Sequence, residues 1–145
     1  MTPKPTALDV LIEAKKLFGF AGHKWTRVAE TRLGLTGRNY CSIGAIDQAC
    51  KTLKADLNTK FAALDLLEEA AGYQEITFWN DSGIKNEVAT RKWSRLQNLA
   101  FVSWLLVSYI PGAGKLLYQT RIKPVWCKVI NNAADKQLQT EDQHG

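Results

Sequence analysis

This chain is poor in the residues that bind metals or close disulfides. It has two histidines, His23 and His144, and three cysteines, Cys41, Cys50 and Cys127, none of them in a C-x-x-C pair. Distant histidines and scattered cysteines do not give the ligand spacing of a zinc site, and an odd cysteine suits free thiols better than a disulfide framework. We therefore expect reduced thiols in a cytoplasmic protein, with no metal and no cofactor.

Long hydrophobic runs are also scarce. The most apolar segment covers residues 99–110 and ends at Pro111-Gly112, whereas a membrane-spanning helix needs about twenty apolar residues. At the N-terminus, Pro3 and Pro5 precede an amphipathic stretch, in place of the continuous apolar core of a signal peptide. The sequence predicts neither membrane insertion nor export.

Size and composition predict one globular domain. With 145 residues, 46% hydrophobic and 23% charged, the chain can bury a core without disulfides or metals. The expected fold class is all-α, a single compact bundle of about four to six helices with a loop or small hairpin between the first two. Within the single domain 1–145 we expect a helical part (6–97), a helical C-terminal extension (98–138) and a mobile tail (139–145).

Helix signals recur along the chain. Thr6 and Asp9 have the spacing of a capping box, and Gly19 or Gly22 should end the helix that they open. Pro124 should separate the last two helical segments. The further helices are expected over residues 41–53, from Asp56 or Asn58 to Gly72, from 80–82 to 109–110, over 115–120 and after Pro124.

Several short motifs occur together in the first two-thirds of the chain. They are Trp25-Thr26, Tyr40-Cys41-Ser-Ile-Gly44-Ala45-Ile46, Gly72-Tyr73, Ile76, Trp79-Asn80-Asp81 and Val88. With these motifs, residues 6–97 resemble an uncharacterised family of small bacterial and bacteriophage proteins with a Cys-x-x-Gly-Ala and a Trp-Asn-Asp motif. The resemblance implies an origin in bacteria or their phages, hence the cytoplasm of a bacterial host cell. It does not imply a particular activity, because the family has none assigned.

Cys41 stands at a predicted helix start. The partial positive charge there favours a thiolate, so a nucleophile based on Cys41, with His23 as base and Asp81 nearby, is one hypothesis. A thiol packed against Gly44 and Ala45 is the simpler interpretation. We expect no catalytic residue.

The Trp79-Asn80-Asp81 motif permits two interpretations. An indole, an amide and a carboxylate gathered at a helix start can bind a ligand. Asn80 and Asp81 can equally serve as helix N-caps, with Trp79 as a buried anchor, and the sequence favours this structural interpretation.

Positive charge is concentrated in the second half of the chain. Between residues 82 and 134 the only acid is Glu87, and the basic residues are Lys85, Arg91, Lys92, Arg95, Lys115, Arg121, Lys123 and Lys128. Such a basic face can complement an acidic protein surface or a phosphate backbone. It can also be an ordinary solvated helix face.

The apolar segment 99–110 supplies a second candidate surface. Its large side chains suit either the core or an interface with another molecule. The predicted interface patch consists of Phe101, Trp104, Leu105 and Tyr109.

Together these features favour binding over catalysis. The working hypothesis is an accessory protein of a phage or mobile element that occludes a host defence or nucleic-acid enzyme through the basic face. The expected partner is a host protein with an acidic surface. Direct nucleic-acid binding, self-assembly as a virion or structural protein, and a thiol enzyme using Cys41 are the alternatives.

Overall fold

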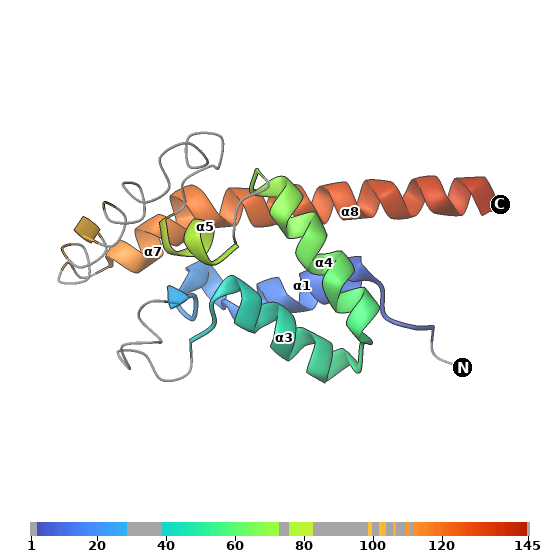
Figure 1. The fold of residues 1–145 in the computed structure, drawn as a ribbon, viewed down its shortest axis with the longest axis horizontal. Helices are drawn as coiled ribbons and strands as arrows, with labels where there is room; N and C mark the ends of the chain where they lie inside the picture. Colours follow the sequence, from blue (N-terminus) through green and yellow to red (C-terminus); the bar gives the residue numbers. More distant parts are fainter. Residues whose placement is uncertain are drawn as a thin grey trace.

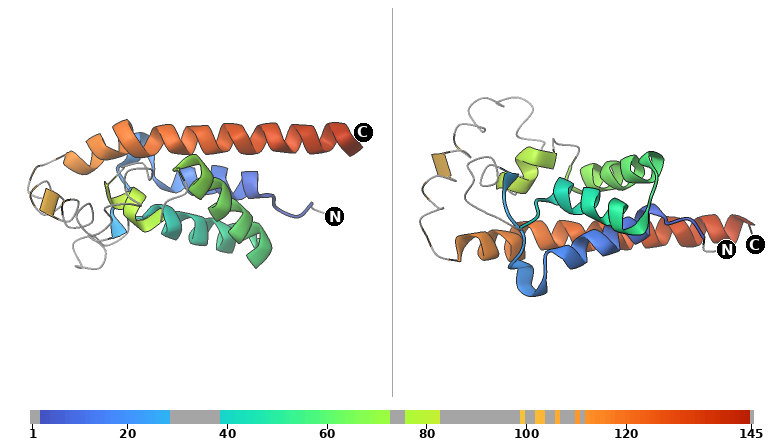
Figure 2. Two further views of the ribbon diagram at one scale, coloured as in Figure 1. Left: turned by 45° about the horizontal axis from the view of Figure 1, so that its top comes forward. Right: turned by 90° about the horizontal axis from the view of Figure 1, so that it is seen from below.

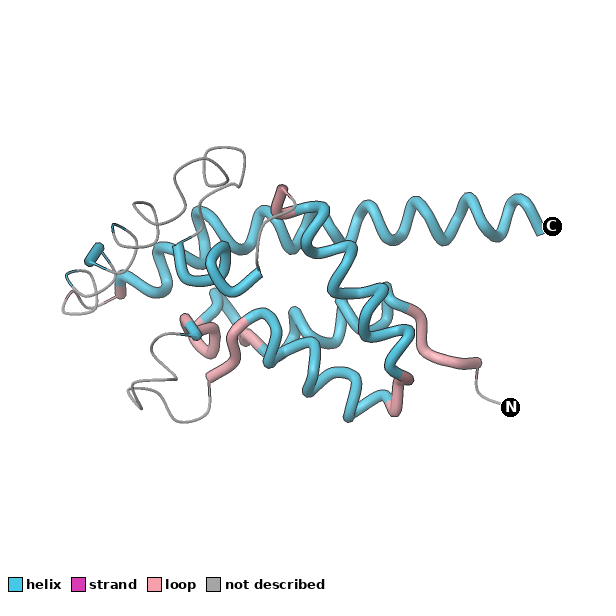
Figure 3. The backbone as a smooth tube through the Cα atoms, viewed as in Figure 1, coloured by secondary structure: helices cyan, strands magenta, loops and turns pink. Residues whose placement is uncertain are grey.

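The computed structural model describes residues 3–28, 39–72, 76–82 and 112–144, together with positions 99, 102, 103, 106 and 110. Within these residues the protein is an all-α compact bundle, and Figure 3 shows only helices and loops there. The predicted fold class is therefore confirmed. Among the same residues, no helix combines the length and the apolar composition that crossing a membrane requires.

The first helix, α1 (Ala7–Leu17), begins where the capping box predicts. The Thr6 hydroxyl accepts from the Asp9 amide at 3.2 Å, and the Asp9 carboxylate accepts from the Thr6 amide at 2.9 Å. The helix ends before Gly19, whose φ of 75° is a backbone conformation that favours glycine. A short 3₁₀ turn, η1 (Phe20–Gly22), follows.

Two helices cover one side of α1. Helix α3 (Ser42–Leu53) is capped by the Cys41 sulfur, which accepts from the Gly44 amide at 3.3 Å. Helix α4 (Leu57–Ala70) is capped by Asp56, which accepts from the Thr59 amide at 2.8 Å. Both helices start and end close to the predicted positions, because local capping chemistry marks their starts.

The C-terminal part forms one long helical rod. The helix α7 (Ala113–Leu117), the π-helical turn η2 (Tyr118–Ile122) and the helix α8 (Lys123–His144) follow one another without a gap. Figure 2 shows α8 running along α1 and extending beyond the ends of α1, α3 and α4.

The expected break at Pro124 is absent, which corrects the sequence-based prediction. Proline lacks the amide that would bond to the preceding turn, and its ring crowds the carbonyl four residues earlier. Here the preceding turn is wider, since the Lys123 amide donates to the Tyr118 carbonyl five residues back. The helix also continues to His144 through the segment 139–145 that the sequence predicts as a mobile tail.

The connection between α1 and α3 is held at its two ends. Trp25 and Tyr40 form an isolated parallel bridge, with the Thr26 amide donating to the Tyr40 carbonyl at 3.0 Å. Hairpin arms pair antiparallel, so the hairpin alternative is wrong for these two residues. The positions between them, 29–38, lie outside the described residues.

The core lies where α1, α3, α4 and the rod meet (Figure 1). Its centre is aromatic: the ring of Phe18 lies 5.3 Å from that of Trp126, edge to face, and 5.6 Å from that of Tyr118. Phe18 and Trp126 are fully buried. Burying side chains of this size is the main stabilising term of the bundle.

Candidate functional site

The Trp-Asn-Asp motif lies inside the short helix α5 (Ile76–Ser82) and not at a helix start. The cap interpretation of Asn80 and Asp81 is therefore wrong. Trp79 is buried as predicted, at 1% exposure. The Asp81 carboxylate accepts from the amide of Val28 at 2.7 Å, which fixes the chain after Trp25 against α5.

Asn80 is the centre of a buried hydrogen-bond network. It is fully buried, and its side-chain oxygen accepts from the Trp25 indole nitrogen at 3.0 Å. The same oxygen accepts from the Ser42 amide at 2.9 Å and from the Ser42 hydroxyl at 2.7 Å. The Asn80 side-chain nitrogen donates to the Thr26 carbonyl at 3.0 Å. One amide group therefore joins α5, the start of α3 and the segment after α1.

The network reaches the C-terminal rod through Ser42. The Trp126 indole nitrogen donates to the Ser42 hydroxyl oxygen at 3.3 Å. Both side chains are fully buried, and buried polar groups of this kind are costly unless they are paired. The fold thus brings together three of the sequence motifs, Trp25-Thr26, Cys41-Ser42 and Trp79-Asn80-Asp81. The hydrogen bonds between them stabilise the fold.

The alternative thiol site would need Cys41 and His23 to lie within hydrogen-bond distance of each other. The Cys41 sulfur is occupied as the cap of α3, and the exposed His23 ring has its Nδ1 atom 2.8 Å from the Phe20 carbonyl oxygen. In the described part of the chain no hydrogen bond joins Cys41 to His23. Nor do the described residues contain a group of three or more histidine, cysteine or acidic side chains able to hold a metal ion.

The predicted basic face is only partly described. Lys85, Arg91, Lys92 and Arg95 lie outside the described residues, as do the patch residues Phe101, Trp104, Leu105 and Tyr109. Lys115, Arg121 and Lys123 are exposed on the rod, and Lys128 is exposed one turn further on.

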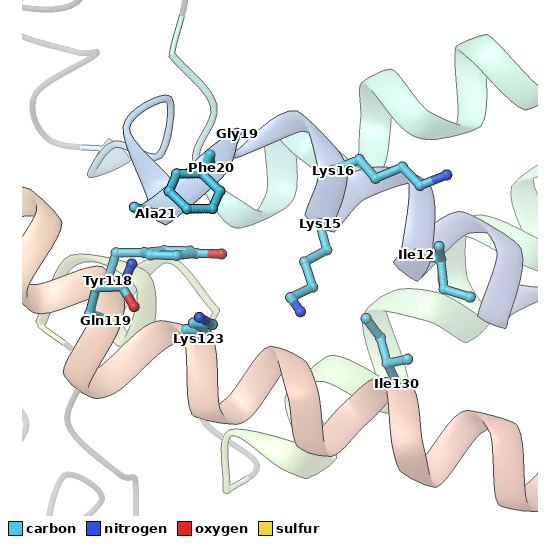
Figure 4. Close-up of a pocket in the computed structure, with 10 residues that line it drawn as sticks. All are labelled: Ile12, Lys15, Lys16, Gly19, Phe20, Ala21, Tyr118, Gln119, Lys123 and Ile130. Carbon is cyan, nitrogen blue, oxygen red and sulfur yellow. The ribbon is translucent and has the colours of Figure 1, made fainter.

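A cavity of about 580 Å³ separates the end of α1 from the rod (Figure 4). Its lining carries three lysines and no carboxylate, so the cavity is positively charged. The lining residues are Ile12, Lys15, Lys16, Gly19, Phe20, Ala21, Tyr118, Gln119, Lys123 and Ile130.

Tyr118 is held in this cavity by contacts with three other residues. Its ring lies against Phe18 and Trp25 at 5.6 and 6.1 Å, and it packs so closely on Gly22 that an added Cβ there would come within 2.0 Å of it. The residue is 3% exposed, and burial raises the pKa of its phenol, with a smaller contribution from Cys127. At neutral pH it is therefore a fixed hydrogen-bond donor.

Sequence reasoning missed the contribution of α1 to this basic region. Lys15 and Lys16 are in the last turn of α1, where they complement the negative end of the helix. The Lys15 ammonium lies 3.6 Å from the Cys127 sulfur, across 112 positions of the chain. No local pattern signals an approach over that separation.

Comparisons of the chain with protein-family models, with curated proteins and with solved structures found no match.

Proposed function

We propose that this protein is a non-catalytic binding protein that docks on an acidic surface of a partner protein through the first part of its C-terminal rod. The observation that carries the proposal is the charge of that rod. From residue 112 to residue 134 it has no acidic residue. The four basic side chains of this segment, Lys115, Arg121, Lys123 and Lys128, are all exposed.

The backbone of the rod holds these charges in fixed positions. Its buried side is anchored by Tyr118, Ile122 and Trp126, so the backbone that carries the exposed cations is fixed by the core. Exposed charges arranged on a rigid surface accelerate encounter with an oppositely charged partner and select its orientation. Little ordering entropy is then lost on binding.

The aromatic residues of the rod favour a protein partner over a nucleic acid. Proteins that bind single strands stack bases on exposed aromatic rings. Tyr118 and Trp126 are 3% and 0% exposed, so neither can act as a stacking platform. Docking on an acidic protein surface requires the exposed cations and no exposed aromatic ring.

The biological setting follows from the resemblance to bacterial and phage proteins. An accessory protein of a phage or mobile element would occlude a host defence or nucleic-acid enzyme by covering an acidic surface of that enzyme with this rod. The interaction would take place in the cytoplasm of the host cell.

The test is a capture experiment with matched charge reversals. Tagged wild-type protein is incubated with nuclease-treated bacterial lysate and compared with Lys115→Glu/Arg121→Glu and with Lys4→Glu/Lys136→Glu, which changes the net charge equally at exposed positions outside the basic segment. The proposal predicts one stoichiometric protein that is lost only with the first variant. Capture that disappears with nuclease would indicate nucleic-acid binding instead.

Self-association is a second candidate, favoured by one observation. Leu99, Val102, Leu106 and Ile110 are 62%, 51%, 67% and 59% exposed. Their spacing of three, four and four positions is typical of one face of a helix that packs on another molecule. Sedimentation across micromolar concentrations would show a monomer–dimer equilibrium if these residues form an interface, and a monomer throughout if they do not.

A further inference from the structure

We propose that the cavity between α1 and the rod is a binding site for a small organic anion, a phosphate or carboxylate attached to an apolar ring or short chain. This goes beyond docking on a partner protein. Lys123 belongs to both surfaces, but the cavity also depends on Lys15 and Tyr118, whereas Lys115 and Arg121, the two docking cations reversed in the capture test, do not line it. The two properties can therefore be tested separately.

The Tyr118 hydroxyl is the first argument. The ring of Tyr118 is buried against Phe18, Trp25 and Gly22, and no hydrogen bond of its hydroxyl is found among the described residues. Figure 4 shows this hydroxyl pointing into the space between α1 and the rod. The hydroxyl is not one of the buried polar atoms that lack a partner in the described structure, so it is open to the cavity and can donate to a ligand acceptor there.

The Lys15 ammonium also favours an anion in this cavity. It is half-buried and lines the cavity, and among the described residues its one polar contact is the Cys127 thiol at 3.6 Å, a weak acceptor. Lys16 has Glu13 at 3.9 Å, but no carboxylate lies within salt-bridge distance of Lys15 among the described residues. Lys123 adds a second positive charge to the lining. An oxyanion between these amines would supply the missing counter-charge.

The remainder of the lining is apolar. Ile12 and Ile130 face each other across the cavity beyond Lys15, on the side away from Tyr118 (Figure 4). Phe20 lines it near Ala21 and is 92% exposed, which leaves its ring free to cover a ligand. Charged groups and apolar walls on different sides of one cavity select a molecule with an anionic head and an apolar body.

The size and rigidity of the cavity fit such a ligand. Its volume of about 580 Å³ falls within the range of about 300–1,000 Å³ typical of small-molecule sites. Gly22, with a φ of 76°, allows the turn after α1 to pack directly on the Tyr118 ring. The π turn begins at Tyr118 and keeps the rod continuous on the other side. The donor is therefore positioned before any ligand arrives.

The experiment uses phenyl phosphate and benzoate as probes, with the full-length protein, in ligand-observed NMR and tryptophan-fluorescence titrations. Benzyl alcohol tests the need for the anion, and inorganic phosphate tests the need for the apolar body. We expect phenyl phosphate or benzoate to bind with a Kd of about 1 mM or tighter. Benzyl alcohol and inorganic phosphate should bind at least about tenfold more weakly.

Three variants decide whether binding occurs in this cavity. Tyr118→Phe removes the hydroxyl and keeps the ring, and Lys15→Met removes the charge and keeps the stem; each should weaken probe binding about five- to tenfold. Lys115→Met, an exposed position outside the cavity, should leave it unchanged. Thermal denaturation establishes that each variant is folded. Weaker probe binding in either Tyr118→Phe or Lys15→Met is sufficient to place the probe in this cavity.

Three results would overturn the site. They are no binding of either probe at ~10 mM, binding that neither Tyr118→Phe nor Lys15→Met weakens, and inorganic phosphate binding as tightly as phenyl phosphate. Loss of partner capture in Lys115→Glu/Arg121→Glu leaves this titration unaffected, so the two proposals fail independently.

Discussion

The indole nitrogen of Trp25 donates a 3.0 Å hydrogen bond to the side-chain oxygen of Asn80, 55 positions further along the chain. The same oxygen also accepts from Ser42, so that replacing Asn80 removes the acceptor of several buried donors at once. We predict that Asn80→Leu lowers the free energy of unfolding by about 3 kcal/mol or more, since each orphaned buried donor costs about 1–3 kcal/mol. Urea denaturation followed by tryptophan fluorescence measures the loss.

The control for this substitution is Asn58→Leu, in the exposed first turn of α4. It makes the same chemical change without a buried network and should alter stability by no more than about 0.5 kcal/mol. Equal effects of the two substitutions would contradict the assigned role of Asn80.

Local sequence signals predict much of the fold, but they do not predict the hydrogen-bond network of Asn80. The capping box at Thr6 and the N-cap Asp56 act over three residues, and both predict a helix start correctly. Asn80 belongs to a residue type that caps helices, yet its partners Trp25 and Ser42 are 55 and 38 positions away. A single sequence contains no information on contacts of that separation.

The continuous rod and the cavity could not be predicted from sequence, because both depend on more than local signals. Pro124 carries a local signal for a break, which the π turn before it overrides. The lysines of the rod could be recognised from sequence as a basic region, but Lys15 joins them only through the packing of α1 on α8.

Three glycines separate steric from conformational effects. Gly22→Ala would bring a Cβ within 2.0 Å of Tyr118 at a φ of 76°, and we expect it to lower the free energy of unfolding by about 3 kcal/mol. Gly112→Ala meets nothing within 4 Å at a φ of 82°, so only the backbone cost of about 1 kcal/mol should appear. Thermal or urea denaturation measures all of these changes.

Gly114→Ala completes the glycine series. It adds a methyl group in open space within α7, where alanine is the better helix former. It should raise stability by about 0.5–1 kcal/mol. A Gly22→Ala variant no less stable than Gly112→Ala would contradict the close packing of Tyr118 on the turn.

The ion pairs of Asp47 should make stability depend on pH in acid. A hydrogen bond from Lys60 at 2.7 Å, supported by Lys51 at 3.3 Å, lowers the pKa of this carboxyl below its ordinary value of 3.8. A lowered folded-state pKa contributes stability that is complete above the unfolded-state value and is lost as the pH falls through the folded-state value. Because Asp47 is 42% exposed, solvent screening limits the contribution to about 0.5–1 kcal/mol.

Comparing Asp47→Asn with wild type at a series of pH values checks this dependence. The stability difference should be present at pH 6 and should disappear as the pH falls below about 3.8. Asp65→Asn, at an exposed position of α4 without an ion pair in the described structure, should show no such trend. A difference for Asp47→Asn that is the same at pH 6 and in strong acid would contradict the pairing.

The three thiols should differ in reactivity. Cys50 is 7% exposed, and burial raises the pKa of its thiol, so both access and thiolate formation are disfavoured. Cys41 and Cys127 are half-buried. Iodoacetamide at pH 8, followed by peptide mass spectrometry, should label Cys41 and Cys127 well before Cys50. Labelling of Cys50 at the same rate in buffer and in urea would contradict its burial.

The most direct test of the central claim, docking through the rod, is an amine-labelling footprint of the protein alone and in complex with the captured partner. Lys115, Lys123 and Lys128 are exposed in the free protein, as are Lys51, Lys54 and Lys136 on other parts of the bundle and rod. We predict that acylation of Lys115, Lys123 and Lys128 falls at least about threefold in the complex, while Lys51, Lys54 and Lys136 are labelled as before. Unchanged labelling of the first three lysines, or protection confined to the other three, would contradict docking through this face.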